Sequence, residues 1–199
     1  MVGIIDYGVG NLFSLRSSFA AIGVEAFVSG DAGELAKADR LILPGVGAFG
    51  DAAEKLRASG LDAFVREQAA AGKPLMGICL GMQLLFERSF EYGEHFGLGL
   101  LKGQVVGMSG RLPEGLKIPH MGWNALKLTK PAKLLEEGSY VYFVHSFYAE
   151  NGEDSLAAVT DYGIPITAAV EKGNIFGCQF HPEKSGNVGL AILKKFCEV

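Results

Sequence analysis

The stretch KPLMGICLGMQLLFE, residues 73–87, decides the fold because it joins an apolar run to a helical pattern across a G-x-C-x-G turn. The run PLMGIC (74–79) predicts a buried strand, and GMQLLFER (81–88) predicts a helix. A sharp strand-to-helix turn needs small residues on both sides, and the two flanking glycines supply them. Such a turn would expose the thiol of Cys79 at the carboxyl edge of a sheet.

The first half of the chain repeats this alternation of strands and helices. Apolar runs predict strands at 2–6, 24–28 and 39–45, and helical spacing predicts helices at 11–23 and 51–71, with a break at Gly60. Strands that alternate with helices favour a parallel sheet covered on both faces, with its sites at the carboxyl ends of the strands.

The second half is richer in strands. They are predicted at 104–108, 123–129, 139–150, 155–161, 166–173 and 175–183, with a turn at Asn151-Gly152 and a closing helix at 187–199. We therefore expect an α/β protein with a single domain, residues 1–199. Its central sheet would be mixed but mostly parallel and flanked by helices, with additional antiparallel strands in the second half.

Composition excludes several classes of protein. Hydrophobic residues make up 49% of the 199 residues, which is typical of a globular chain. The net charge of −4, without a run of basic residues, argues against a nucleic-acid-binding protein. We find no signal peptide and no membrane-spanning run, and three cysteines fit free thiols in a reducing, cytoplasmic setting. Neither CxxC nor HxxxH spacing occurs, so no metal site is expected.

Cys79 has two interpretations, a buried thiol that fills the core or a nucleophile. A nucleophile needs a base, and the base needs an orienting group. The segment QFHPEK places His181 just after an apolar strand and Glu183 two residues later. If the chain is extended there, both side chains point to the same side, and the carboxylate can hold one ring nitrogen while the other faces the sulfur. We therefore predict Cys79, His181 and Glu183 as the catalytic residues.

An oxyanion hole would complete such a site. Attack on an amide forms a tetrahedral oxyanion, which is stabilised by preorganised N–H donors. The amide of Leu80, directly after the nucleophile, is one candidate. The turn Gly45-Val46-Gly47, at the end of the third predicted strand, offers a second donor from Val46 or Gly47.

The G-x-C-x-G turn and the distant HPE together resemble the class I glutamine amidotransferases. Further segments resemble one branch of that family, the glutaminase subunits of imidazole glycerol phosphate synthase. These segments are DYGVGN (6–11), PGVGAFGDA (44–52), PHMGWN (119–124), FVHSF (143–147) and QFHPEKSG (179–186). The resemblance implies that glutamine is hydrolysed to glutamate and ammonia through a glutamyl thioester on Cys79, without a cofactor.

The resemblance also implies the contacts to glutamine. They would come from Gly45, Gln83, Glu91, His145, Ser146 and Phe147. A zwitterion requires a carboxylate for its ammonium group, which by this resemblance Glu91 would supply, and N–H donors for its own carboxylate. Phe147 stands where the resemblance leads us to expect a tyrosine, so a hydroxyl is absent from that position.

The resemblance also implies a partner subunit. In the family, ammonia passes to a cyclase subunit, a (β/α)8 barrel, for histidine biosynthesis, and the two subunits form a heterodimer. Asn11, Met121, Trp123 and Lys184 lie in the branch-specific segments and are predicted at that interface. Glutaminase activity would be low without the cyclase, because the Val46-Gly47 peptide could flip between presenting its N–H and its C=O to the site.

Three other interpretations are compatible with parts of the sequence. The chain could be the glutaminase subunit of another class I amidotransferase complex. It could be an unrelated cysteine hydrolase with a similar turn, or a catalytically dead binding subunit. The presence of all three catalytic candidates argues against the last.

Overall fold

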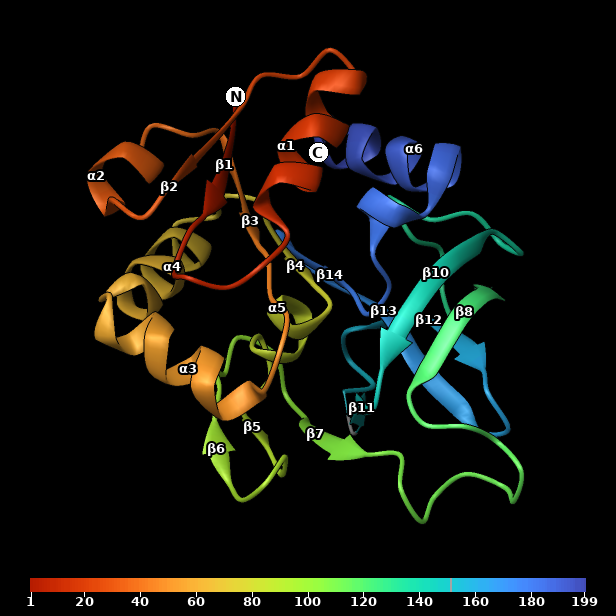
Figure 1. The fold of residues 1–199 in the computed structure, drawn as a ribbon. Coiled ribbons are helices and arrows are strands. Elements are labelled where there is room, and N and C mark those ends of the chain that lie inside the picture. The colour runs from red at the N-terminus through yellow and green to blue at the C-terminus, as the bar shows by residue number, and fades with distance from the viewer. Residues whose placement is uncertain (151) are drawn as a thin grey trace.

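The computed structural model describes residues 1–150 and 152–199, so the predicted Asn151-Gly152 turn lies partly outside the described residues. An eight-stranded mixed sheet runs through the molecule in the order β2-β1-β3-β4-β14-β13-β12-β9 (Figure 1). Its strands are β1 (Val2–Ile5), β2 (Ala26–Ser29), β3 (Arg40–Leu43), β4 (Leu75–Ile78), β9 (Lys127–Leu128), β12 (Leu156–Asp161), β13 (Pro165–Lys172) and β14 (Ile175–Cys178). The first five strands in that order are parallel, and the remaining pairs are antiparallel, which confirms the predicted fold class.

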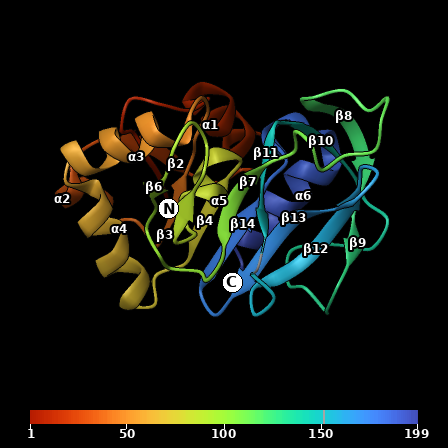
Figure 2. The same ribbon diagram turned by 90° about the horizontal axis from the view of Figure 1, so that it is seen from below.

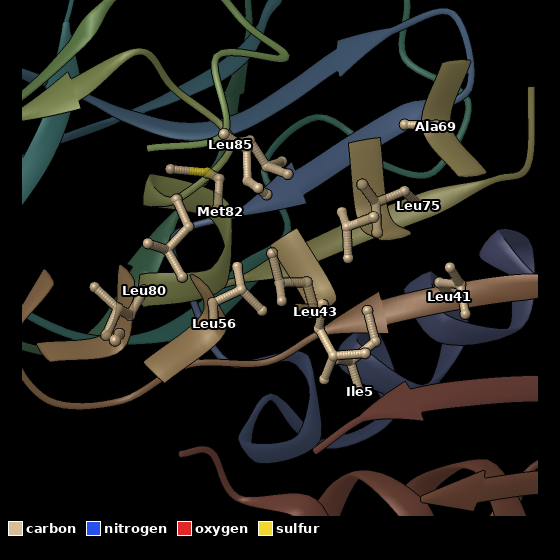
Figure 3. Close-up of a cluster of buried hydrophobic side chains, with 14 of the residues drawn as sticks. Ile5, Leu41, Leu43, Leu56, Ala69, Leu75, Leu80, Met82 and Leu85 are labelled. Carbon is tan, nitrogen blue, oxygen red and sulfur yellow. The ribbon is translucent and has the colours of Figure 1, made fainter. Parts of the chain in front are cut away.

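Helices cover both faces of the sheet because successive strand side chains point to opposite sides. The helices are α1 (Leu12–Ala21), α2 (Ala32–Leu35), α3 (Phe49–Ala58), α4 (Leu61–Ala70), α5 (Leu80–Gln83) and α6 (Gly186–Phe196), with a 3₁₀ turn η1 at Pro182–Lys184. On β3, Leu41 and Leu43 pack with α3 and α4, whereas Ile42 packs with α1 and α6. Figure 3 shows the first of these cores, which includes Leu43, Leu75 and Leu80.

Two smaller sheets are attached to the central one. One is the antiparallel pair β8 (His120–Ala125) and β10 (Tyr140–His145). The other has the order β11-β7-β5-β6, with β5 (Arg88–Ser89), β6 (His95–Phe96), β7 (Gln104–Gly107) and β11 (Phe147–Glu150). The β8–β10 pair lies at the opposite end of the molecule from α2 and α4 (Figure 2). No helix in the described part of the chain has the length and apolarity to span a membrane.

Several predictions of local structure were wrong. The strand expected at 123–129 is divided between β8 and β9, which belong to different sheets, and the strand expected at 175–183 ends at Cys178. The helix expected at 81–88 ends at Gln83, because the carbonyls of Leu84, Leu85 and Phe86 accept hydrogen bonds from the loop at 98–101 instead of continuing the helix. The single strand expected at 139–150 is two strands that join different sheets and separate at Ser146. The sequence analysis also missed the short elements α2, β5 and β6.

Candidate active site

The predicted turn after β4 is present and holds Cys79 in a strained backbone conformation. Cys79 has φ 54° and ψ −112°, a region that residues other than glycine rarely adopt and that clusters at functional sites. A Cβ on Gly77 would lie 2.6 Å from the carbonyl oxygen of Gly81, and a Cβ on Gly81 would collide with the carbonyl of Leu43. The two glycines therefore permit the sharp turn that carries the thiol.

His181 and Glu183 form a buried pair next to Cys79. Nδ1 of His181 lies 2.8 Å from Oε1 of Glu183, and the exposed fractions of the two side chains are 4% and 1%. The expected extended backbone is present only at His181, since Glu183 lies in η1. The tight 3₁₀ turn, rather than strand alternation, brings the carboxylate back onto the ring.

The environment of His181 favours its protonated form. Burial lowers its pKa, but hydrogen bonds and the charges of Cys79 and Glu183 outweigh burial and raise the pKa to about 9. A protonated imidazole beside a sulfur can donate a proton to a leaving amine.

The hydroxyl of Ser185 stabilises the 3₁₀ turn that follows His181. It donates a hydrogen bond to the carbonyl of His181 and accepts one from the amide of Tyr142.

A cavity of about 410 Å³ brings most of the predicted site residues together. They are Val46, Gly47, Cys79, Leu80, Gln83, Glu91, His145, Ser146, Phe147, His181 and Lys184. Gly45 lies behind this wall, where its Cβ position is 2.7 Å from the amide nitrogen of Gly81. Gly45 thus allows close packing of the loop on the turn and does not border the cavity. Tyr92, which the sequence analysis missed, also lines the cavity.

The residues that carry the candidate oxyanion donors line this cavity from two separate segments, the loop after β3 and the start of α5. Leu80 is the first residue of α5, so its N–H has no acceptor within the helix. Gly47 has φ +94°, and nothing lies within 4 Å of its Cβ position. Pro44 begins this loop, and its carbonyl accepts a hydrogen bond of 2.6 Å from the buried hydroxyl of Tyr7.

Glu91 presents a buried carboxylate at the same cavity. Its Oε2 accepts a 2.7 Å hydrogen bond from the amide of Phe49, the first residue of α3. Burial raises the pKa of Glu91 despite that hydrogen bond. A buried carboxylate of this kind gains from an ammonium partner.

The carbonyl of Phe147 accepts hydrogen bonds from two other side chains of the cavity. It accepts from Nδ1 of His145 at 2.9 Å and from Nε2 of Gln83 at 3.0 Å. Burial lowers the pKa of His145 to about 3 and that of His120 to about 4, so both rings are neutral at pH 7. Since a carbonyl only accepts, the proton of His145 is on Nδ1, and its Nε2 accepts from Nδ1 of His120 at 3.0 Å. Both ring nitrogens of His145 are therefore occupied by protein groups.

The residues predicted at a partner interface lie at the surface or near it. Met121 and Trp123 on β8 are 63% and 54% exposed, so Trp123 does not fill the core. Lys184 is exposed on η1 and also lines the cavity, and Asn11 is half-buried before α1. Among the described residues, no group of three or more His, Cys, Asp or Glu side chains is placed to hold a metal ion.

Comparison with known proteins identifies the family. The family model described as glutamine amidotransferase class-I matches residues 3–199. Imidazole glycerol phosphate synthase subunit HisH of Wolinella succinogenes is 52% identical over the full length of both chains. The chain belongs to the HisH branch of the class I glutamine amidotransferases. The HisH subunit of Bacillus subtilis is 49% identical over 100% of this chain and 96% of that protein.

Solved structures give the same amidotransferase fold. A crystal structure described as a glutamine amidotransferase superposes with a TM-score of 0.77 over 99% of this chain and 97% of that one, at 22% identity. The PurLQS structure from Thermotoga maritima has a TM-score of 0.74 with the same coverage and identity. Membership of the amidotransferase family excludes the unrelated cysteine hydrolase.

Proposed function

We propose that this chain is the glutaminase subunit of an imidazole glycerol phosphate synthase. It would hydrolyse glutamine and pass the ammonia to a cyclase subunit in the cytoplasm. The observation that supports this function most directly is the buried His181–Glu183 pair beside Cys79, on a cavity lined by the residues expected to bind glutamine. The full-length similarity to HisH proteins points to the synthase rather than another amidotransferase complex.

In the first half-reaction the sulfur of Cys79 attacks the side-chain amide carbon of glutamine. The amide of Leu80 and the Val46-Gly47 peptide stabilise the tetrahedral oxyanion. When the C–N bond breaks, Nε2 of His181 protonates the leaving nitrogen. Ammonia departs and a glutamyl thioester remains on Cys79.

In the second half-reaction water replaces ammonia. Neutral His181 removes a proton from the water, whose oxygen attacks the thioester carbon. The C–S bond breaks, glutamate leaves and the sulfur is regenerated. Glu183 orients the ring in both steps because it holds Nδ1 and leaves Nε2 directed at the reaction.

Glutamine would be recognised by groups of complementary charge and polarity. The carboxylate of Glu91 receives the α-ammonium group, and backbone groups at His145, Ser146 and Phe147 receive the α-carboxylate end. Both hydrogens of Gln83 Nε2 are used, one by Phe147 and one by Gln179. Gln83 therefore offers only its carbonyl oxygen to a ligand.

The cyclase would dock where branch-specific residues reach the surface. Met121 and Trp123 provide exposed apolar area, and Lys184 is exposed and also lines the cavity. The ammonia would be incorporated into a phosphorylated aminoimidazole precursor of histidine, giving imidazole glycerol phosphate and an aminoimidazole carboxamide ribotide.

One assay tests this function. Glutamate production is measured for the purified chain alone, with a cyclase subunit of imidazole glycerol phosphate synthase, and with the cyclase plus its ribonucleotide ligand. Stimulation by this cyclase, and not by the synthase partner of another amidotransferase, is expected. Equal activity under all conditions would contradict the proposed partner, and no labelling of Cys79 by a glutamine-analogue affinity reagent would contradict the glutaminase itself.

A further inference from the structure

Gln179 is a fully buried amide that lies outside the cavity wall and contacts the nucleophile. Its exposed fraction is 0%, and its Nε2 lies 3.7 Å from Sγ of Cys79, within hydrogen-bond reach of a sulfur acceptor. Its Oε1 accepts from Nε2 of Gln83 at 3.0 Å. A buried amide with both ends engaged is held in one orientation.

Strand register explains why two residues 100 positions apart meet. Ile78 on β4 and Cys178 on β14 are partners in a parallel pair, and the amide of Cys79 continues the ladder by donating to the carbonyl of Cys178. Cys79 and Gln179 are therefore the next residues at the same edge. The backbone amide of Gln179 in turn donates a hydrogen bond to the carbonyl of Ala168 on β13.

The carbonyl of Phe147 determines which end of the Gln179 amide faces the sulfur. A carbonyl only accepts, so the end of Gln83 that faces Phe147 must be the NH₂ group. That same NH₂ group contacts Gln179, so Gln179 must turn its oxygen toward Gln83. Its NH₂ group is then the end directed at Cys79, and the assignment follows from the network rather than from the shape of the amide.

We propose that Gln179 is a further catalytic residue, whose side-chain N–H donates a hydrogen bond to the Cys79 sulfur and stabilises the thiolate. The donor acts when Cys79 attacks and again when the sulfur leaves the thioester. The amide keeps its hydrogen throughout, and proton transfer remains with His181. Hydrogen bonds to charged acceptors are stronger than neutral ones, so the contact favours the thiolate over the thiol. The role in glutamine hydrolysis rests on the proposed function, whereas the effect on the sulfur does not.

Alkylation by iodoacetamide tests the thiolate directly, because it requires neither glutamine nor a partner. The full-length wild type, Gln179→Met and Gln179→Glu are alkylated from pH 5 to 10, and modification of Cys79 is followed by peptide mass spectrometry. Gln179→Met removes both hydrogen bonds at similar size. Gln179→Glu keeps an acceptor for Gln83 and replaces the donor with a carboxyl group, which also brings a negative charge near the sulfur when it is ionised. Cys197, which is half-buried at the end of α6, is an internal control in every sample.

We expect alkylation of Cys79 at pH 7 to slow about tenfold in Gln179→Met, with its pH midpoint raised by about one unit. Gln179→Glu should be slowed at least as much, since an oxygen then faces the sulfur. If the pH dependence of Cys79 alkylation were unchanged in Gln179→Glu, with that of Cys197 also unchanged, the proposal would be overturned. Gln179 would then only position the side chain of Gln83. If Gln179→Met fails to fold, the isosteric Gln179→Glu decides. Failure of a glutamine analogue to label wild-type Cys79 would instead count against the proposed function.

Discussion

Nδ1 of His181 lies 2.8 Å from Oε1 of Glu183, and a single 3₁₀ turn is enough to bring the two side chains together. The carboxylate stabilises a protonated ring, and Pro182 between them restricts the backbone of the turn. The pair is therefore built by local sequence, whereas its position beside Cys79 depends on the pairing of β4 with β14.

Replacement of Cys79 by alanine should remove glutamine hydrolysis and leave the fold intact. We expect glutamate production in the presence of the cyclase to fall by at least about 10⁴-fold, because no other group can form the thioester. Cyclase binding, measured by titration calorimetry, should be unchanged. Cys197→Ala is the matched control and should retain full activity; hydrolysis retained in Cys79→Ala would exclude the thioester mechanism.

The raised pKa of His181 predicts how stability depends on pH. Its folded pKa of about 9 exceeds the unfolded value of 6.5, so this stabilisation is fully present below pH 6.5 and is lost as the pH rises through 9. The loss should be on the order of 3 kcal/mol in the free energy of unfolding. Urea unfolding between pH 6 and 10 measures it. Glu183→Gln should give a shallower decline, and identical curves for the two proteins would refute this origin of the shift.

The two glycines of the turn should not tolerate a side chain. Gly81→Ala places a Cβ against the carbonyl of Leu43, and the resulting overpacking should destabilise the protein by about 3 kcal/mol in chemical unfolding. Gly23→Ala provides the comparison, since its Cβ position is open and only its φ of +73° opposes the change. That variant should lose about 1 kcal/mol. Equal losses would show that the collision with Leu43 costs no more than an unfavourable φ, and would contradict the prediction.

Glutaminase activity should be low until the partner and its ligand are bound. Gly47 has a positive φ and free space around it, which allows the Val46-Gly47 peptide to rotate at low cost. We expect at least about a hundredfold rise in glutamate production when cyclase and its ribonucleotide ligand are added, equivalent to about 2.7 kcal/mol of coupling. High activity of the purified chain alone would be incompatible with such a switch.

Trp123 should contribute to partner binding and little to stability. The residue is 54% exposed, and its ring meets that of Tyr142 edge-on at 6.1 Å between centroids. Trp123→Ala should weaken cyclase binding by about 2 kcal/mol, or about thirtyfold in Kd, as is typical of a large interface aromatic. Phe96→Ala on β6, with an exposed fraction of 65%, is the control and should leave Kd unchanged. Wild-type affinity in Trp123→Ala would place the interface elsewhere.

Much of the fold could be predicted because the spacing of apolar residues along the chain indicates which segments form strands and which form helices. Apolar runs and helical spacing located the parallel half of the sheet and the break between α3 and α4 at Gly60. The end of α5 could not be predicted in this way. Leu84, Leu85 and Phe86 are buried residues that continue the apolar pattern of the helix, and only the distant loop at 98–101 removes their carbonyls from it.

In the candidate site, too, some features could be predicted from the sequence and others could not. The sequence by itself determined the pair of His181 with Glu183, because that pair depends on contacts within a few residues. The turn that carries Cys79 was also predictable from its two glycines, although the group that excludes a side chain at Gly81 is the distant carbonyl of Leu43. The tertiary structure alone decided that Gln179 reaches the sulfur and that Gly45 stays behind the wall. Strand register and loop packing join residues far apart in the chain, and no local pattern encodes which atoms then meet.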